Sequence, residues 1–349
     1  MDKKNILVLF GGVSPEHEIS KLSADTVIKH LCEEKYQIIP VYITKEGKWL
    51  LYEGAIDQIK NISWEKFGTP AVLSPDRTNR GLLRIVGDRV KTIPVDAVLP
   101  VLHGENGEDG TIQGLCAMAG IPCAGCGVLS SAVCMDKSFM RIIAGHIGLP
   151  QTKYLVFNKY ELSDMDAVAK TIRSELGYPC FIKPASAGSS IGIVKAGNKK
   201  EIIKGVETAL SVGNRILVEK AVTGREIECG VLGAAPDIRV SVPGEVVAAA
   251  EFYDYNAKYH STESQEIVPC DIPKTAEETI KQMATAIFKA TDGNGLARVD
   301  FFLDKKGKVI FNEINTVPGF TSISMFSKAW EASGVPLSDV LDTIIALAV

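Results

Sequence analysis

The chain has 349 residues, 46% of them hydrophobic and 23% charged, which indicates a globular protein of about two or three domains. Its formal net charge of −4 excludes the broad basic surface that nucleic acid or an anionic membrane would require. No apolar stretch approaches the ~20 residues needed to span a bilayer, and the apolar run near the N-terminus is too short for a signal peptide. We therefore expect a cytoplasmic protein that binds neither nucleic acid nor membrane.

The N-terminal part of the chain alternates apolar runs with helical segments. Asn5–Phe10 is a continuous apolar run, typical of a strand buried on both faces, and Tyr36–Ile43 is a second predicted strand. Between them Gly11-Gly-Val precedes Ser14, a good N-cap, and Pro15, a good first helical residue, so a helix is expected through about Glu34. The glycine-rich turn favours a ligand at the carboxyl end of the strand, with an ordinary turn as the alternative.

A histidine stands at the end of the next apolar strand. Val95–Leu102 is followed by the glycine-rich loop His103–Gly110 and by a helix predicted for Thr111–Ala119. A histidine at this position is placed for a ligand, and a core histidine is the alternative. The preceding segment 53–94 is polar. The strand and helix alternation predicts a doubly wound domain up to about residue 124.

The eight cysteines lie mostly in apolar surroundings, where reduced thiols act as small hydrophobic side chains. Cys123 and Cys126 have the spacing of a zinc or redox pair, but no second pair or histidine pair follows them. A metal or redox role for this pair is therefore disfavoured.

The middle of the chain contains a loop of small and hydroxyl-bearing residues. A helix is predicted for Ser130–His146, with Lys137 at its middle, and a strand for Cys180–Lys183. The loop Pro184–Gly192 follows, before a short strand at Ile193–Lys195. Such a loop presents backbone N–H groups, and with Lys183 at its base it is suited to capping phosphates. A plain hairpin loop is the alternative, because no Gly-Lys-Ser/Thr opens a helix here.

The C-terminal part predicts a β-hairpin with one charged face. Gly295–Leu303 and Val309–Thr316 are joined by a polar turn containing Gly307. Alternation places Arg298 with Asp300 on one face, and Glu313 with Asn315 on one face of the partner strand. The opposite faces are expected to pack together, through Val299, Phe301, Ile310 and Ile314. Converging carboxylate and amide oxygens suit Mg²⁺, whereas a solvated face with a surface ion pair is the alternative.

A long polar segment with three tyrosines precedes this hairpin, over Glu251–Gln265. A loop of this length is usually functional or disordered, and the tyrosines favour an ordered lid. A helix is predicted after it for Ala276–Thr291, and another closes the chain at Ser338–Ala348.

Taken in order, these segments resemble the D-alanine–D-alanine ligases, which are ATP-grasp enzymes. The resemblance covers essentially the whole chain and rests on motifs in the expected order: Gly11–Ser20, His103–Gly110, Met135–Lys137, Lys183–Gly192, Val218–Lys220, Phe252–Tyr259, Arg298–Asp300 and Asn312–Gly319. It implies an α/β (α+β overall) ATP-grasp fold with an N-terminal doubly wound parallel-sheet domain. The implied domains are 1–124 for the N-terminal α/β substrate domain, 125–213 for the central ATP-grasp domain, and 214–349 for the C-terminal ATP-grasp domain with its lid and metal site.

The resemblance also implies an ATP site with two Mg²⁺ ions, Mn²⁺ being an alternative ion. The implied metal ligands are Asp300, Glu313 and Asn315. The implied ATP-binding residues are Lys137, Lys183 and Lys258 at the phosphates, Glu219, Lys220 and Val222 at the adenine, and Glu226 at the ribose.

The remaining implied roles concern two D-alanine molecules, joined through an acyl phosphate for peptidoglycan precursor synthesis. Glu16 binds the ammonium of the first, Ser189 and Tyr259 link to Glu16, and Arg298 with the Gly319 N–H stabilises the oxyanion of the tetrahedral intermediate. His103 lies near the first substrate's carboxylate, and Ser324 takes the carboxylate of the second. Members of the family are commonly dimers, so a homodimer is expected.

The second substrate and turnover itself leave alternatives open. Met325 suits the methyl group of D-alanine better than a hydroxymethyl group, yet D-serine remains an alternative because an apolar pocket discriminates one hydroxyl weakly. Tyr259 argues against the D-lactate type. A non-catalytic ATP-binding regulator is the alternative from another class.

Overall fold

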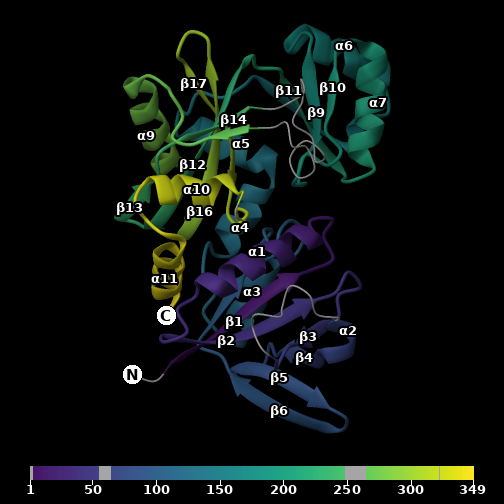
Figure 1. Cartoon of the computed structure of the whole chain (residues 1–349). Helices are drawn as coiled ribbons and strands as arrows, with labels where there is room; N and C mark the ends of the chain where they lie inside the picture. The colour runs from purple at the N-terminus through teal and green to yellow at the C-terminus, as the bar shows by residue number, and fades with distance from the viewer. Residues whose placement is uncertain (1–2, 55–63, 248–264, 322) are drawn as a thin grey trace.

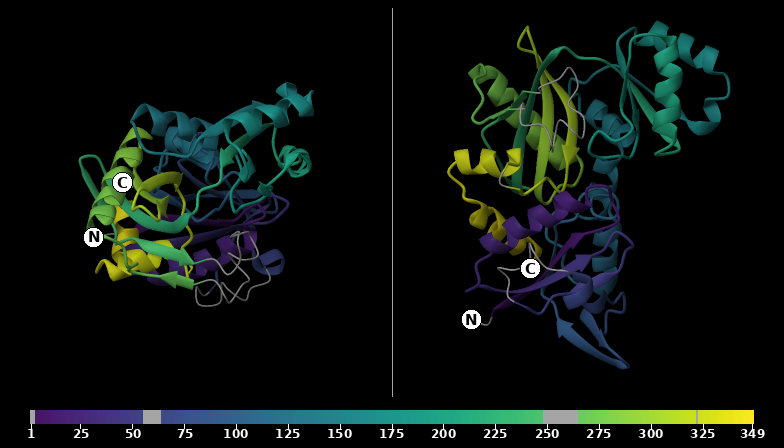
Figure 2. Two further views of the ribbon diagram at one scale, coloured as in Figure 1. Left: turned by 90° about the horizontal axis from the view of Figure 1, so that it is seen from above. Right: turned by 45° about the vertical axis from the view of Figure 1, so that its right-hand side comes forward.

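The computed structural model describes residues 3–54, 64–247, 265–321 and 323–349 (Figure 1). Its strands form three sheets, of seven, four and six strands. The N-terminal sheet lies at the bottom of Figure 1, the C-terminal sheet above it, and the central sheet at the upper right; the turned views of Figure 2 keep the central sheet at the periphery of the molecule. Lys258 and Tyr259 lie outside the described residues.

The N-terminal sheet is mixed, with strand order β6-β5-β4-β3-β2-β1-β7. Strand β1 (Lys4–Gly11) pairs in parallel with β2 (Tyr36–Ile43) and with β7 (Ala97–Pro100). The remaining strands are antiparallel: β3 (Trp49–Leu51), β4 (Thr69–Leu73), β5 (Gly81–Val86) and β6 (Arg89–Pro94). The expected parallel sheet is therefore confirmed for β2, β1 and β7, at one end of the sheet, while segment 53–94 adds antiparallel strands at the other end and the short helix α2 (Trp64–Phe67).

Helices cover both faces of this sheet. Helix α1 (His17–His30) packs on the face that carries Ile6 and Val8 of β1, and α3 (Thr111–Ala119) packs on the face that carries Leu7 and Leu9. The alternation of side chains along β1 thus serves two apolar layers, as expected for a doubly wound domain.

Helix α1 begins later than the sequence indicated. A helix was expected from Ser14, but the Ser14 hydroxyl accepts a hydrogen bond from the N–H of Glu16 at 3.1 Å, and its carbonyl accepts one from the N–H of His17 at 3.1 Å. This tight turn uses the capping groups of Ser14 before the helix starts, and so Glu16 rather than Ser14 stands at the N-terminal boundary of α1.

The expected helix over Ser130–His146 is two helices, α4 (Val128–Met135) and α5 (Lys137–His146). The break is at Asp136, whose backbone is extended and whose carboxylate accepts hydrogen bonds from the N–H groups of Ser138 and Phe139 at 2.9 and 3.2 Å. Asp136 is therefore the N-cap of α5 and places Lys137 in the first turn of that helix.

The central sheet has one face covered and one face open. Its order is β10-β9-β11-β8, and all pairs are antiparallel: β8 (Tyr154–Asn158), β9 (Cys180–Pro184), β10 (Val194–Ala196) and β11 (Arg215–Lys220). Helices α6 (Met165–Glu175) and α7 (Lys199–Leu210) supply the apolar side chains that cover one face. A 3₁₀ turn, η2 (Lys159–Glu161), follows β8.

The C-terminal sheet has strand order β15-β14-β12-β16-β17, and β13 pairs with β12. Its strands are β12 (Gly224–Ala234), β13 (Asp237–Val240), β14 (Gly244–Val247), β15 (Gln265–Ile267), β16 (Gly295–Asp304) and β17 (Val309–Asn315). Helix α9 (Lys274–Ala290) packs on one face of β12, β16 and β17. Helices α10 (Met325–Ala332) and α11 (Leu337–Ala348) end the chain.

The predicted hairpin is β16 and β17, with a register shift at Asp300/Phe301 that the sequence did not reveal. Asp300 lies opposite Glu313, but Phe301 lies opposite Phe311, so Asn312 is the extra residue of a β-bulge. Beyond the bulge, the alternation of side chains between the two faces of the sheet is shifted by one residue along β17. Phe311 therefore joins Phe301 in the apolar core, while Ile310, expected on that face, pairs with Phe302 instead.

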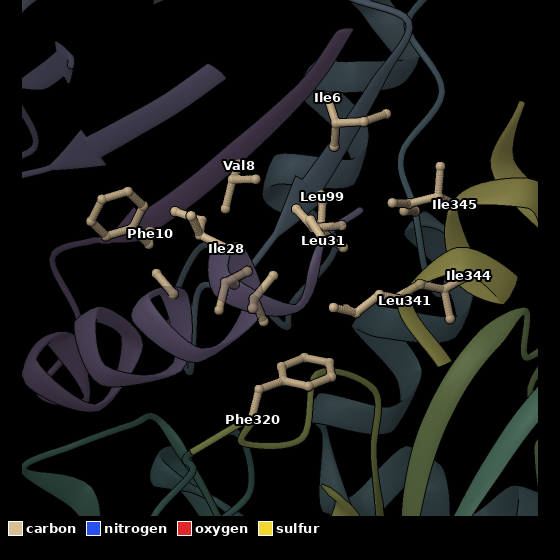
Figure 3. Packing of buried hydrophobic residues seen from close by; sticks show 14 of the residues in the cluster. Ile6, Val8, Phe10, Ile28, Leu31, Leu99, Phe320, Leu341, Ile344 and Ile345 are labelled. Atoms are coloured by element: carbon tan, nitrogen blue, oxygen red, sulfur yellow. The ribbon is translucent and has the colours of Figure 1, made fainter. Parts of the chain in front are cut away.

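One apolar cluster joins the N-terminal sheet to the end of the chain. Ile6 and Val8 of β1 pack with Leu341 and Ile344 of α11, and Phe320 closes the cluster from the loop after β17 (Figure 3). The N–H of Phe320 also reaches the Ser23 hydroxyl of α1 at 3.3 Å. These contacts hold the loop after the hairpin against α1, whose first residues carry Glu16.

Among the described residues, no helix is both long and apolar enough to cross a membrane. All eight cysteines are free, and most are buried.

Candidate active site

Two adjoining cavities lie between the sheets. The larger has a volume of about 420 Å³ and is lined from the open face of the central sheet and from β12, β16 and β17; the smaller, of about 60 Å³, lies toward α1. The larger cavity brings together these predicted residues: Lys137, Lys183, Ser189, Glu219, Lys220, Val222, Glu226, Arg298, Asp300 and Glu313. The smaller brings together Glu16, His103, Lys137, Ser189, Arg298, Glu313, Asn315 and Gly319. Lys137, Ser189, Arg298 and Glu313 thus belong to the wall that both cavities share.

Strand alternation aims these side chains at the larger cavity. On β9, Cys180 and Ile182 face α6 and α7, whereas Phe181 and Lys183 line the cavity. On β11, Val218 packs in the same apolar layer and Glu219 lines the cavity.

Glu219 lies between two cations. Its Oε1 pairs with the ammonium of Lys183, and its Oε2 accepts a hydrogen bond from Nη2 of Arg141 at 2.8 Å. Burial raises the pKa of the Glu219 carboxyl, but the charges of Lys183 and Arg141 outweigh this and lower the pKa to about 2. Glu219 is thus ionised in the folded protein. Arg141 was not among the predicted residues, since an arginine in an amphipathic helix carries no local signal of its partner.

Lys137 faces the hairpin from the first turn of α5. Its Nζ lies 3.1 Å from Oε2 of Glu313 and donates to the carbonyl of Ala187 at 3.0 Å. The charge of Lys137, aided by Lys183, holds the pKa of Glu313 well below its ordinary value. Lys137 therefore connects the loop Pro184–Gly192, called the small-residue loop below, to the Glu313 carboxylate of β17.

Arg298 and Asp300 share a face of β16, as predicted. The Nε and Nη2 atoms of Arg298 donate to the two carboxylate oxygens of Asp300 at 2.8 and 2.7 Å, and Nε lies 3.1 Å from Oε2 of Glu228. Burial alone lowers the pKa of Arg298, but the surrounding carboxylates raise it well above its ordinary value. Sequence reasoning missed Glu228, although it lies directly opposite Asp300 in the sheet and β12 alternates polar and apolar residues there.

The oxygen donors of the hairpin suit a hard cation. Asp300 and Glu313 are paired across β16 and β17, and Asn315 lies opposite Arg298. The Oδ1 atom of Asn312, displaced by the bulge, is buried beside them without a hydrogen-bond partner. In the part of the chain that the structure describes, no three His, Cys, Asp or Glu side chains form a metal cluster, so the donor set consists of two carboxylates with amides. Carboxylate and amide oxygens with open positions fit Mg²⁺ that is also held by phosphates.

Glu16 meets the small-residue loop at the smaller cavity. The Ser189 hydroxyl donates to Oε1 of Glu16, and a side chain at Gly188 or Gly104 would meet Oε2 at 3.1 or 2.8 Å. Ser189 has a left-handed φ of 49°, a conformation that costs a non-glycine residue about 1–2 kcal/mol. The loop is therefore held in a specific shape against Glu16, as predicted for the Glu16–Ser189 pair.

His103 is buried at the floor of the smaller cavity. Its ring nitrogens contact the Val317 carbonyl at 3.1 Å and the Ser23 hydroxyl at 3.0 Å, and Nδ1 lies 3.6 Å from Oε1 of Glu108. Burial lowers the pKa of His103, but Glu108, together with Glu16 and the Val317 carbonyl, outweighs burial and raises it. The pKa of Glu108 is raised, chiefly by burial. Glu108, which sequence reasoning did not single out, lines the same cavity.

The residues expected around the second substrate lie after the hairpin. Gly319 lines the smaller cavity, and a side chain there would meet the Ser324 hydroxyl at 2.8 Å. That hydroxyl contacts the N–H and the hydroxyl of Thr321 at 3.0 and 2.8 Å. Met325 is buried against Gly244 and lines neither cavity.

Two family models match the chain. A family model described as D-ala D-ala ligase N-terminus matches residues 5–126, and one described as D-ala D-ala ligase C-terminus matches residues 143–346. The chain belongs to the D-alanine–D-alanine ligase family. It is a ligase with the ATP-grasp fold that this family has.

Similar proteins support the family over the whole chain. A relative from Caldicellulosiruptor bescii, named D-alanine–D-alanine ligase, is 48% identical, with 100% of this chain and 96% of the relative covered. Among solved structures, the VanG D-Ala:D-Ser ligase from Enterococcus faecalis has a TM-score of 0.91 at 39% identity and is covered completely, as is this chain. The D-alanine–D-alanine ligase from Coxiella burnetii has a TM-score of 0.87 at 33% identity, covering 99% of this chain and 95% of that one.

Proposed function

We propose that this ligase joins two D-alanine molecules into D-alanyl-D-alanine, using ATP, for peptidoglycan precursor synthesis. The observation that supports the proposal is that the two cavities share one wall. Lys137, Arg298 and Glu313 face both a large cavity with cations on its open sheet and a small cavity that contains the Glu16 carboxylate. A triphosphate in the first and an amino acid in the second would meet at these side chains.

The larger cavity would take ATP. Lys137 and Lys183 hold the phosphates as point charges, with Lys258 of the lid as a third contact. Glu219, Lys220 and Val222 border the adenine, and Glu226 the ribose. Asp300, Glu313 and Asn315 would hold two Mg²⁺ ions, with Mn²⁺ as an alternative. Bound metal neutralises charge on the phosphates during transfer.

The smaller cavity would take the first D-alanine. Glu16 accepts its ammonium, Ser189 and Tyr259 keep Glu16 in place, and His103 lies near its carboxylate. One carboxylate oxygen attacks the γ-phosphorus of ATP, which gives an acyl phosphate and releases ADP. The small-residue loop and the lid exclude water, which would otherwise hydrolyse this intermediate.

The second D-alanine then attacks the acyl carbon through its amine. Arg298 and the N–H of Gly319 stabilise the oxyanion of the tetrahedral intermediate, which expels phosphate and leaves the amide. Ser324 holds the carboxylate of this second substrate. D-alanine is favoured because relatives that are 45–48% identical over the whole chain are named D-alanine–D-alanine ligase.

D-serine is the second candidate for the same position, because a structure of high similarity belongs to a D-Ala:D-Ser ligase. Phosphate release with ATP, Mg²⁺ and D-alanine alone, compared with the same mixture plus D-serine, separates the two. We expect full turnover with D-alanine alone and less than about a twofold rise on adding D-serine, since one hydroxyl is weakly discriminated. Turnover only with D-serine would contradict the assignment, and no phosphate with any D-amino acid would favour a non-catalytic ATP-binding regulator.

Three further parts of the proposal concern the whole chain. We place the domains at 1–124, 125–213 and 214–349, except that β11 (Arg215–Lys220) pairs with β8 and β9 of the central sheet, which moves the second boundary beyond Lys220. The enzyme works in the cytoplasm, where its nucleotide is found, and it forms a homodimer, which sedimentation would test.

A further inference from the structure

Arg141 is a buried cation behind the wall of the larger cavity, where it contacts Glu219. The side chain is 1% exposed and lines neither cavity. Its Nη1 donates to the carbonyl of Phe311 at 2.9 Å, its Nη2 donates to Glu219 at 2.8 Å, and its Nε has no partner. An enclosed guanidinium is costly to desolvate, so its retention calls for a compensating role.

The contacts of Arg141 change the charge balance behind the cavity wall. Glu219 lies between Arg141 and Lys183, one cation on each carboxylate oxygen. Without Arg141, Lys183 and Glu219 would form a neutral pair. With Arg141, the three side chains carry one net positive charge. Of the two cations, Lys183 is the one that faces the cavity.

The other enclosed cations of the wall have carboxylates of their own. Lys137 pairs with Glu313, and Arg298 pairs with Asp300 and Glu228. A polyphosphate binds most strongly to positive charge that the protein has not already neutralised, especially where water is excluded. Among these pairs in the described structure, Glu219 is the carboxylate shared by two cations.

We propose that Arg141 is a positioning residue for ATP: it neutralises Glu219, so that the charge of Lys183 is free to act on the phosphates. Its bond to Phe311 also ties this group to β17, next to the bulge that carries Asn312 and Glu313. The inference rests on the proposed function, because that function assigns the phosphates to Lys183. A role in packing alone would make the size of the side chain matter rather than its charge.

The test measures the dissociation constant of ATP with Mg²⁺ by calorimetry, for the parent protein, R141M, R141K, E219Q and R141M/E219Q. R141M should bind ATP about 10- to 100-fold more weakly, because it removes one charge from the group while keeping an apolar side chain of similar length. R141K keeps the charge and should stay within about threefold of the parent. In R141M/E219Q both charges are gone and Lys183 is again uncompensated, so this variant should bind ATP within about threefold of E219Q, which already lacks the carboxylate that borders the adenine.

Two further measurements separate this role from a structural one. The KM for ATP should rise in R141M while the KM for D-alanine changes by less than about threefold. Circular dichroism and thermal unfolding establish that each variant is folded. If R141M does not fold, R141M/E219Q is compared with E219Q, where loss of Arg141 should weaken ATP binding by less than about threefold because no carboxylate remains to be neutralised.

The outcomes are distinct. Folded R141M that binds ATP as the parent does overturns the inference and leaves the proposed function standing. A tenfold loss of affinity between E219Q and R141M/E219Q also overturns it. A parent protein that binds no ATP overturns the proposed function and this inference with it.

Discussion

At the scale of single residues, the site consists of buried and half-buried carboxylates held by cations. Glu313 is held by Lys137, Asp300 by Arg298, and Glu219 by Lys183 and Arg141. Truncating one partner of such a pair leaves both a void and an uncompensated charge, whereas an isosteric amide keeps the shape and changes only the charge. Substitutions to Gln or Asn therefore test chemistry with little change of packing.

The first prediction concerns the proposed metal carboxylate. Glu313→Gln should lower turnover by about a thousandfold or more, because an amide binds Mg²⁺ poorly and cannot balance the charge of transfer. Phosphate release measures turnover, and circular dichroism checks the fold. Glu245→Gln is the matched control: Glu245 is a buried carboxylate of the same sheet, paired with Arg225, and it lines neither cavity. Turnover of Glu313→Gln near the rate of the control would refute the assignment.

The second prediction concerns stability in acid. The pKa of Glu219 falls from an unfolded value near 4.5 to about 2 in the folded protein, so its ionised form stabilises the fold above pH 4.5. This stabilisation should be lost as the pH falls from 4.5 toward 2, because the unfolded state then binds the proton first. Urea unfolding across this range measures the slope, and Glu219→Gln should have a shallower one. An unchanged slope in the variant would mean that Glu219 is not held in its charged form.

At the scale of elements, the break between α4 and α5 positions the phosphate-facing residues. Asp136 caps α5, pairs with Arg215, and accepts a hydrogen bond from the Ser186 hydroxyl of the small-residue loop at 2.9 Å. One carboxylate thus aligns the helix that carries Lys137 with the loop that carries Ser189.

Asp136→Ala should therefore destabilise the protein by about 1–2 kcal/mol and also weaken ATP binding. Asp164→Ala is the matched control, since Asp164 caps α6 with the same two types of N–H bond and lies away from both cavities. The control should lose similar stability in urea unfolding with its KM for ATP unchanged. Equal effects of both substitutions on KM would show that the cap, rather than the link to the loop, is what matters.

Much of the element order could be predicted from the sequence, and the differences have physical causes. Tyr36–Ile43 and Thr111–Ala119 have the predicted bounds because apolar runs and helical periods are local signals. Strand β6 was missed because nearly all of its residues are exposed, so no period marks it. Ile310 was placed on the wrong face because a bulge shifts the alternation, and nothing in the residues of β17 announces the shift.

The predicted site residues that the structure describes gather in the two cavities, apart from Ser324 and Met325. The motifs that identified them are contiguous, and strand alternation fixes which side chains point inward. Arg141 and Glu228 were missed because their partners, Glu219 and Arg298, are far away in the sequence, whereas Glu108 was missed although its partner His103 belongs to the same glycine-rich loop. A charged residue in a helix or a half-buried strand is ordinarily solvated, so its burial is a tertiary property.

At the scale of the whole molecule, the last helix couples the two ends of the chain. Leu341 of α11 packs against β1 and α1 in the cluster of Figure 3 and is fully buried. Leu341→Ala should cost about 2–5 kcal/mol in urea unfolding, through lost burial and the cavity left behind. Leu347→Ala on the same helix is the control, because that side chain is 39% exposed and should cost less than about 0.5 kcal/mol. Equal losses would mean that α11 is not packed as described.

The account depends on the two cavities meeting at one reacting centre, so that the carboxylate of D-alanine takes the γ-phosphoryl group of ATP. Turnover with D-alanine labelled with ¹⁸O in its carboxylate tests this directly, by mass spectrometry of the phosphate released. One labelled oxygen should pass into each phosphate, because the acyl phosphate is cleaved at its carbon–oxygen bond when the second amine attacks. Phosphate without the label would contradict the account, since ATP would then be cleaved without activating the acid.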